Sequence, residues 1–446
     1  MDNCPKDTPL LPELKLSRIA VDMTPLLPGA ENGGAKLLAL ELVRNMCKLL
    51  PDCEFVLLTS DTSHEELSLL DSFNVRRQCV RHQETRYGSP ISPKQIRRMW
   101  GHLKQWLIIS MPPFLLTRLK HLYLGLQARR RPSTGILKGI GADLLFCPLT
   151  MPFFYDPAVP VVSVLYDLQH RYYPQFFEWK DYFARERHFK ETCRLADLLI
   201  CISEFVGETV LKNSDLLPER VVSIPIRLFG RLKKPTLDAV SAVLQRHGLE
   251  QNEFLLYPAN SWPHKNHPML FTAFGMFRSR HPESKLRLVC TGSPDGRMEF
   301  LKDATRRMGM TGWVYFPGFL SEEEFAALLS SCRALIFPSL YEGFGMPVLE
   351  AMAFGKPVLC SEITSLPEVA GDAALYFDPK KPTEILSSIE RIFLEPELAT
   401  NMTQRGYERI ATLGDAEQMT KEYLQVFYNV IQSRVPMGKL RPKFTP

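Results

Sequence analysis

The fold is indicated by Ala334-Leu-Ile-Phe-Pro-Ser-Leu-Tyr-Glu-Gly-Phe-Gly-Met-Pro-Val-Leu-Glu350, where an apolar run ends at a proline and a glycine-containing turn follows. The run predicts a strand, and Gly343 and Gly345 allow positive φ and close approach to a ligand. Pro347 favours the start of a short helix, which Gly355 ends. The helix N-terminus offers unpaired backbone N–H groups and a positive dipole end, so it suits a diphosphate.

Two carboxylates frame this helix start. Glu342 lies in the turn and Glu350 lies one turn into the helix. A carboxylate that faces vicinal hydroxyls accepts two hydrogen bonds, which is how acidic side chains hold ribose or hexose. Two glutamates at this spacing are common by chance, but their place in a strand, glycine turn and proline-started helix makes the pattern specific. The segment therefore predicts a sugar-nucleotide site.

The same alternation of strand, turn and helix extends over the whole chain in two series, which predicts an α/β protein with two Rossmann-like doubly wound domains facing across a cleft. The runs are apolar on both faces, as expected of parallel strands covered by helices. The predicted strands are 18–23, 55–60, 143–148, 161–167 and 198–203 in the first series, and 254–259, 286–292, 334–338, 357–361 and 375–378 in the second.

The regular pattern breaks between residues 228 and 238, where Arg231, Lys233, Lys234 and Pro235 stand together. We therefore predict an N-terminal domain over 1–235 and a donor-binding domain over 236–416. An amphipathic pattern over 416–433 predicts a final helix, which we assign to a separate C-terminal segment, residues 417–446.

Composition narrows the function. The chain has 446 residues, 45% hydrophobic and 23% charged, with a net charge of +5. This mild charge and the absence of any nucleic-acid-binding motif predict no nucleic-acid partner. Four of the ten cysteines lie in apolar runs, and no CxxC pair exists, so we expect small buried thiols rather than disulfides or zinc ligands: Cys147, Cys201, Cys290 and Cys360.

One basic segment, about residues 85–142, does not fit a plain α/β domain. It holds eleven lysines and arginines and no acidic residue, with Trp100, Trp106 and Phe114 interleaved among them. Such a stretch is typical of contact with an anionic membrane surface, although a covering helix with a solvated basic face would look the same. With no secretory signal over 1–16, we expect a cytoplasmic protein, or a peripheral one on the inner face of the membrane.

The stretch around Glu342 and Glu350 resembles the signature of glycosyltransferase family 4, retaining enzymes of the GT-B architecture. The resemblance covers most of the second half and, more loosely, the first, where Tyr166-Asp-Leu-Gln-His170 is similar to bacterial O-antigen and lipopolysaccharide mannosyltransferases. The remaining matching stretches are Tyr257–His267, Cys290–Gly292, Pro317–Ser321, Leu366–Ala373 and Val21–Pro25 with Gly33-Gly34.

The resemblance implies that the helix of residues 417–446 crosses back to the first domain. It also implies a role for each matching residue. Glu342 and Lys265 would be catalytic, the first at the hexose and the second neutralising the leaving diphosphate. Glu350 would hold the ribose hydroxyls, and Leu320 and Ser321 would lie beside the base. Further donor contacts would come from Gly343, Phe344, Gly345, Met346, Gly292, Asn260, His264, Gly33 and Gly34.

Two departures from the family pattern bear on these roles. The family often has an arginine shortly before the phosphate-binding lysine, and here Asn260 or His264 would share that load. A His-Asp pair of the first domain appears as Tyr166-Asp167, which leaves the sugar or acceptor contacts to Tyr166, Asp167 and His170. For His170 a structural role is the alternative.

The expected function is transfer of a hexose with retention, and of mannose from GDP-mannose in particular, onto a glycan or lipid-linked acceptor. The resemblance implies no metal or other cofactor, and His264 and His267 have no third ligand at a useful spacing. The alternatives are a UDP-sugar-dependent transferase, a GT-B sugar-nucleotide epimerase or hydrolase, and a degenerate, non-catalytic membrane-associated partner.

Overall fold

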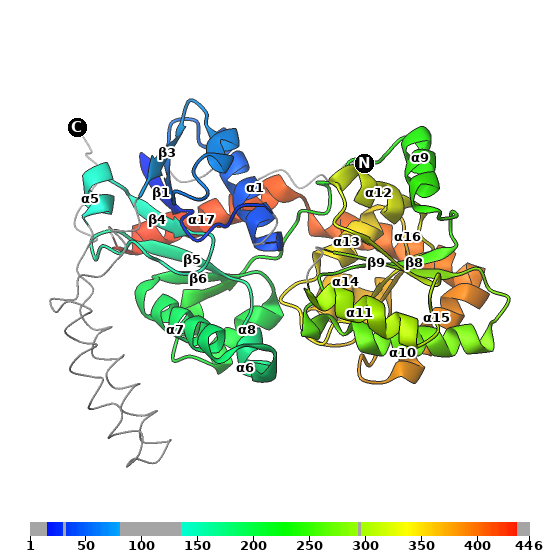
Figure 1. Cartoon of the computed structure of the whole chain (residues 1–446). Helices are drawn as coiled ribbons and strands as arrows, with labels where there is room; N and C mark the ends of the chain where they lie inside the picture. The colour runs from blue at the N-terminus through cyan, green and yellow to red at the C-terminus, as the bar shows by residue number, and fades with distance from the viewer. Residues whose placement is uncertain (1–15, 30–32, 81–134, 293–295, 435–446) are drawn as a thin grey trace, which may run out of the picture. The chain divides into compact units, whose positions relative to one another are not determined.

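The protein was analysed as a computed structural model, which describes residues 16–29, 33–80, 135–292, 296–434. Two parallel sheets account for its strands (Figure 1). Most of the predicted basic segment, up to residue 134, lies outside the described residues. Its last part is described and contains a short helix, α5 (Ile136–Ile140). None of the described helices is long and apolar enough to cross a membrane.

The first sheet has the order β3-β2-β1-β4-β5-β6-β7. Its inner strand β1 pairs in parallel with β2 and β4, so that Ile19 lies opposite both Phe55 and Leu144. The strands are β1 (Arg18–Asp22), β2 (Glu54–Thr59), β3 (Val75–Cys79), β4 (Leu144–Cys147), β5 (Val161–Leu165), β6 (Leu198–Cys201) and β7 (Val221–Ser223). The accompanying helices are α1 (Gly33–Leu49), α6 (Gln169–Tyr172), α7 (Trp179–Leu195) and α8 (Glu204–Lys212).

The second sheet has the order β10-β9-β8-β11-β12-β13. Its strands are β8 (Phe254–Pro258), β9 (Arg287–Thr291), β10 (Val314–Gly318), β11 (Ala334–Phe337), β12 (Val358–Ser361) and β13 (Ala374–Phe377). Helices cover both faces, with α9 and α12 packed together on one and α10 and α15 on the other (Figure 1). The helices of this half are α9 (Leu237–His247), α10 (His267–Arg280), α11 (Gly296–Arg307), α12 (Glu322–Ser331), α13 (Met346–Ala353), α14 (Leu366–Ala370), α15 (Pro382–Leu394) and α16 (Pro396–Leu413).

The central strands form the cores of the two sheets. β4, β8, β11 and β12 are buried along almost their whole length, which is why their sequences are continuous apolar runs. The thiols of these cores are free, and the four cysteines predicted as small buried residues have no exposed surface: Cys147, Cys201, Cys290 and Cys360. The α/β prediction with two doubly wound sheets is confirmed.

Packing contacts divide the chain into two compact units. The first comprises Met1–Val164, Arg187–Leu199 and Leu424–Pro446, and the second comprises Leu165–Glu186 and Ile200–Tyr423. The last helix, α17 (Ala416–Arg434), contributes to both, and the ring of Phe427 lies 5.0 Å from that of Phe146 within the first unit. The boundaries at residues 235 and 416 that we drew from the sequence stay predictions.

Candidate functional site

Lys265 and Glu342 form an ion pair, with 2.6 Å between Nζ and Oε1. Lys265 ends a 3-10 turn (Pro263–Lys265) after β8, and Glu342 follows β11. These strands are parallel neighbours in the second sheet, so their carboxyl ends deliver both loops to the same edge. The structure thus brings together the two side chains to which the sequence assigned catalytic roles.

Polar contacts fix the loop that carries Lys265. The buried Tyr257 donates its hydroxyl hydrogen bond to the carbonyl of Lys265. The Nδ2 of Asn266 donates to the carbonyls of Pro338 (3.0 Å) and Pro379 (2.8 Å). Pro338 directly follows β11, so the side-chain amide of Asn266 links the loop that carries Lys265 to the loop that carries Glu342.

The loop of Glu342 is held from its other side by the residues after β12. The single hydroxyl proton of Ser365 is shared between the carbonyls of Glu342 (3.1 Å) and Phe344 (2.9 Å), and Thr364 Oγ1 accepts from the backbone N–H of Glu342 (3.3 Å). These bonds satisfy backbone groups that would otherwise be buried without partners, and they give the glutamate a defined place.

The two glycines of this loop are needed for different reasons. Gly345 has a φ of 109°, as the sequence predicted, and a Cβ there would lie 2.6 Å from Leu366 Cδ2. Gly343 does not have a positive φ, so that part of the prediction was wrong. A Cβ on Gly343 would lie 2.0 Å from the carbonyl oxygen of Tyr166, so this position is restricted by space alone.

Helix α13 begins directly after this loop. Gly345 is its N-cap residue, no side chain caps its first turn, and Pro347 stands among its first residues, as predicted. Its first-turn amides therefore lack the side-chain partner that N-cap residues such as serine or aspartate usually supply. An anion is the partner that such a helix end favours, and Lys265 lies near the same loop.

Glu350 on α13 is 2% exposed and forms an ion pair that the sequence did not suggest. Arg231 Nε lies 2.8 Å from its Oε1, and Arg231 Nη1 lies 2.5 Å from Glu322 Oε1. Burial raises the pKa of Glu350, and Arg231 opposes that shift. We had assigned Arg231 only to a break between domains, because an arginine 119 positions from its partner leaves no spacing signal.

His264, which was offered with Asn260 as a residue that shares the diphosphate load, lies in an environment that disfavours its charged form. Its side chain is buried, and desolvation, followed by the nearby Lys265 and Arg185, lowers its pKa to about 2. The imidazole is therefore neutral near pH 7, so His264 would contact a diphosphate through a hydrogen bond rather than through charge, and its donor contact stays a prediction. Its carbonyl instead accepts a 2.7 Å hydrogen bond from the N–H of Leu340.

Four other predicted donor contacts lie just after β8, β9 and β10. Asn260 follows β8 and is exposed, while Gly292 directly follows β9 and has a φ of 150°. A Cβ on Gly292 would lie 2.5 Å from the carbonyl oxygen of Ala259. Leu320 is half-buried, and Ser321 is the N-cap of α12, where its hydroxyl accepts from the N–H of Glu324 (3.1 Å). The serine hydroxyl is thus engaged in a capping box.

Gly33 and Gly34 lie in the first unit, where they are the first two residues of α1. We had placed them in a loop after the first strand, and the structure corrects that placement. Their role in donor binding stays a prediction.

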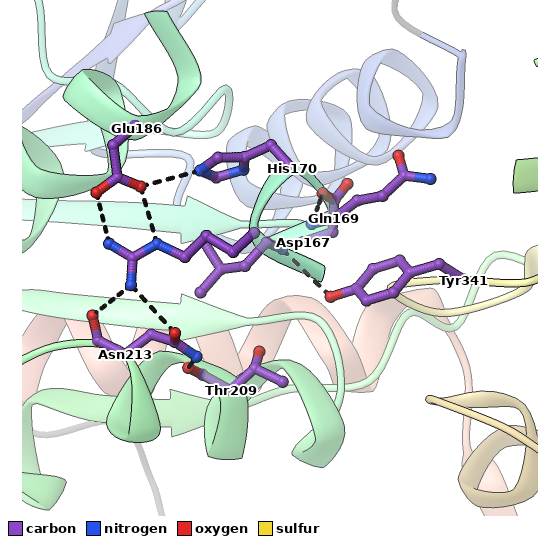
Figure 2. Close-up of polar contacts among 9 residues, drawn as sticks. Asp167, Gln169, His170, Glu186, Thr209, Asn213 and Tyr341 are labelled. Atoms are coloured by element: carbon purple, nitrogen blue, oxygen red, sulfur yellow. Dashed lines mark hydrogen bonds and ion pairs between the residues drawn. The ribbon is translucent and has the colours of Figure 1, made fainter. Parts of the chain in front are cut away.

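The segment after β5 is held by a polar network (Figure 2). Glu186 accepts from Arg171 Nε (2.8 Å) and Nη2 (2.7 Å), and its Oε2 lies 3.3 Å from His170 Nε2. His170 is 2% exposed and packs edge-on against Tyr182. This burial favours the structural alternative for His170 over a sugar contact.

Asp167 and Tyr166 precede this network. An oxygen of Asp167 accepts from the N–H of Gln169 (2.9 Å), while the half-buried Tyr166 has a raised pKa because its hydroxyl is desolvated. Leu168, between them and His170, donates from its N–H to the hydroxyl of Tyr341 (3.4 Å), the residue before Glu342 (Figure 2). Leu168 and Tyr341 belong to the same compact unit.

Comparison with known proteins agrees with this geometry. Residues 242–409 match the family described as glycosyl transferases group 1. This region includes Lys265, Glu342 and Glu350, so all three lie within the match to that family.

Two curated relatives of this chain come from Escherichia coli. O-antigen chain mannosyltransferase B is 28% identical over 261 residues, which are 57% of this chain and 67% of that protein. The serotype-specific mannosyltransferase WbdA is 29% identical over 199 residues, 44% of this chain but only 24% of its own length. The chain thus resembles bacterial O-antigen mannosyltransferases, as the sequence suggested, although it spans about a quarter of WbdA.

The fold is GT-B. Anabaena Alr3699/HepE, whose crystal structure contains UDP and glucose, superposes with a TM-score of 0.65 at 14% identity, over 93% of this chain and 100% of that one. At this identity the likeness concerns the fold alone.

Proposed function

We propose that this glycosyltransferase moves a hexose from a nucleoside diphosphate sugar to an acceptor hydroxyl with retention of configuration. The supporting observation is the ion pair between Lys265 and Glu342 beside the N-terminus of α13, which has no side-chain cap. A lysine and a helix dipole offer a leaving diphosphate two sources of positive potential, and charge that develops in a transition state is stabilised best by such fixed groups.

In the proposed reaction the bond between the sugar C1 and the diphosphate oxygen breaks while an acceptor oxygen bonds to C1 on the same face. The acceptor proton passes to the leaving phosphate, which departs as the nucleoside diphosphate. Glu342 contacts the hexose hydroxyls and Lys265 stabilises the departing charge. A covalent route with Glu342 as the nucleophile, as in retaining glycosidases, fits less well, because its Oε1 is held by Lys265.

We propose GDP-mannose as the donor. The support is the set of relatives named as mannosyltransferases, whereas the UDP in HepE keeps a UDP-sugar as the alternative. Glu350 accepts from the ribose hydroxyls in either case. Following the family resemblance, we propose that the diphosphate is neutralised by Lys265 and α13 without a metal ion.

For the acceptor we propose a glycan or lipid-linked saccharide, reached from the inner face of a membrane. The basic character of residues 85–142 supports this, since lysines and arginines with interleaved tryptophans suit an anionic surface. Sedimentation with vesicles tests it. Binding to vesicles with anionic lipid but not to neutral ones is expected, and negligible binding to both would reject the membrane contact.

A thermal shift screen tests the donor class, because a ligand that binds the folded state raises its apparent stability. GDP and GDP-mannose are expected to raise the melting temperature more than UDP and UDP-glucose. A larger increase with UDP and UDP-glucose would indicate a UDP-sugar as the donor. No increase with any of the four ligands would favour the alternative that this protein is a non-catalytic partner of other proteins. Rapid epimerisation or hydrolysis of the donor without acceptor would favour those activities instead.

A further inference from the structure

Arg231 lies in the segment between β7 and α9, where its guanidinium contacts two carboxylates. Nε lies 2.8 Å from Glu350 Oε1, and Nη1 lies 2.5 Å from Glu322 Oε1. The side chains of Leu228 and Leu232, 4% and 6% exposed, anchor the segment on either side. The N–H of Arg231 also donates to the carbonyl of Leu228 (3.2 Å), so the arginine has a defined position.

Glu350 needs such a partner. Its side chain is 3% exposed, and a buried carboxylate is costly unless a charge and hydrogen bonds compensate the lost water. Burial raises the pKa of Glu350, Arg231 lowers it, and the nearby Glu322 raises it further. In the described parts of the chain, Arg231 and Glu322 are the charged groups that act on this carboxylate.

The two oxygens of Glu350 differ in their partners. Oε1 accepts the hydrogen bond from Arg231, whereas within the described ranges no hydrogen bond to Oε2 is found. Arginine binds in a fixed planar geometry, so it sets the orientation of the carboxylate as well as its charge. One oxygen is held and the other remains available to an incoming hydroxyl.

We propose that Arg231 is a positioning residue of the donor site, which holds Oε1 of Glu350 so that Oε2 accepts from the ribose hydroxyls. Arg231 acts through Glu350 and does not itself touch the sugar. The inference rests on the proposed function, because it requires a nucleotide ribose at Glu350.

Arg227 provides a matched control on the same segment. Its Nη1 lies 2.7 Å from Glu422 Oε1, and its side chain is 11% exposed, so it forms a comparable ion pair that does not involve Glu350. Arg231→Met and Arg227→Met each remove one guanidinium from this segment. If removing a guanidinium disturbs the whole segment, both variants should bind nucleotide more weakly. If only the contact with Glu350 matters, affinity should fall in Arg231→Met alone.

The experiment is calorimetric titration of each variant with GDP, UDP and their 2′-deoxy forms. We expect the wild type to prefer the ribose form, Arg231→Met to bind GDP or UDP about tenfold more weakly, and Arg227→Met to bind like the wild type. The preference for ribose over 2′-deoxyribose should shrink in Arg231→Met, and Arg231→Lys should recover part of it by restoring the charge.

Dependence on pH separates positioning from a purely structural role. Without Arg231 the raised pKa of Glu350 rises further, so the carboxylate is protonated over more of the pH range. The pH below which the affinity falls should therefore be higher in Arg231→Met than in the wild type. Combining Arg231→Met with Glu350→Gln should add no loss to that of Glu350→Gln alone.

The outcomes distinguish this inference from the proposed function. Equal affinities of Arg231→Met and Arg227→Met, or an unchanged ribose preference in Arg231→Met, would overturn the role of Arg231 and leave the donor site intact. If wild-type protein bound neither GDP nor UDP, the proposed function would fail, and this inference with it.

Discussion

Glu342 Oε1 accepts a 2.6 Å hydrogen bond from Lys265 Nζ, and this contact joins the loops after the neighbouring strands β8 and β11. The two side chains are 13% and 18% exposed, so the pair is partly shielded from water. Within this pair the lysine compensates the glutamate charge. A donor diphosphate would offer Lys265 a second anionic partner, so that the pair is poised to exchange partners when the donor binds.

We predict that Lys265→Ala lowers the rate of sugar transfer by about 10²- to 10³-fold, because a fixed charge that stabilises a leaving group is worth that much in comparable sites. Glu342→Gln should also reduce kcat strongly, since it loses the charge that orients the lysine. Steady-state kinetics with saturating acceptor provide the measurement. Lys285→Ala, which removes an exposed lysine paired with Glu250, is the control and should leave the rate unchanged.

Glu350→Ala should act on binding more than on turnover. Its carboxylate is expected to hold the ribose, which does not change during the reaction, so the loss should appear as a higher donor KM with a smaller change in kcat. Donor saturation curves separate the two constants. A fall in kcat with the donor KM unchanged would place Glu350 near the reacting carbon instead.

Gly343→Ala should disrupt the site through space alone. The new Cβ would lie 2.0 Å from the carbonyl oxygen of Tyr166, so the backbone must move, which we expect to cost about 1–3 kcal/mol and most of the activity. Gly275→Ala on α10 is the control, because its Cβ would have its nearest neighbour at 3.6 Å. Thermal unfolding should show a lower Tm for the first variant only; equal Tm values would contradict the close approach.

His264 predicts a pH dependence of stability. Its pKa in the folded protein is about 2, below the ordinary value of 6.5, so its contribution to stability is present above pH 6.5 and decreases as the pH falls towards 2. The cost approaches about 1.4 kcal/mol per pH unit below the ordinary value. His264→Gln should therefore lose less Tm than the wild type between pH 7 and about pH 5. Parallel Tm curves for the two proteins would contradict a buried neutral imidazole.

The predicted independence of metal ions has a direct check. Because Lys265 and α13 are expected to neutralise the diphosphate, transfer activity should be the same with EDTA as with added Mg²⁺ or Mn²⁺. Loss of activity in EDTA, restored by one of these ions, would show that the donor needs a cation.

The sequence predicted the central strands well because they are buried on both faces and read as continuous apolar runs. It missed β3 (Val75–Cys79), β7 (Val221–Ser223) and β10 (Val314–Gly318). All three lie at an edge of their sheet and are only partly buried, so Val75–Cys79 interrupts its apolar residues with two arginines and a glutamine. An edge strand gives no continuous apolar signal.

The site could be predicted where its parts are local in sequence. Glu342, Gly345 and Glu350 are all placed by one strand-turn-helix segment, and Lys265 by the turn after another strand. Arg231 could not be found, because its contact with Glu350 depends on the packing of a segment without regular structure. The charge of His264 could not be judged either, since only its burial reveals that the imidazole is neutral.

Calorimetric titration of GDP-mannose into wild-type protein and into Lys265→Ala tests the central claim most directly, namely that Lys265 and Glu342–Glu350 form the donor site. We predict saturable binding by the wild type and at least about tenfold weaker binding by the variant. Equal affinity in the two proteins, each shown to be folded, would contradict the assignment of this site.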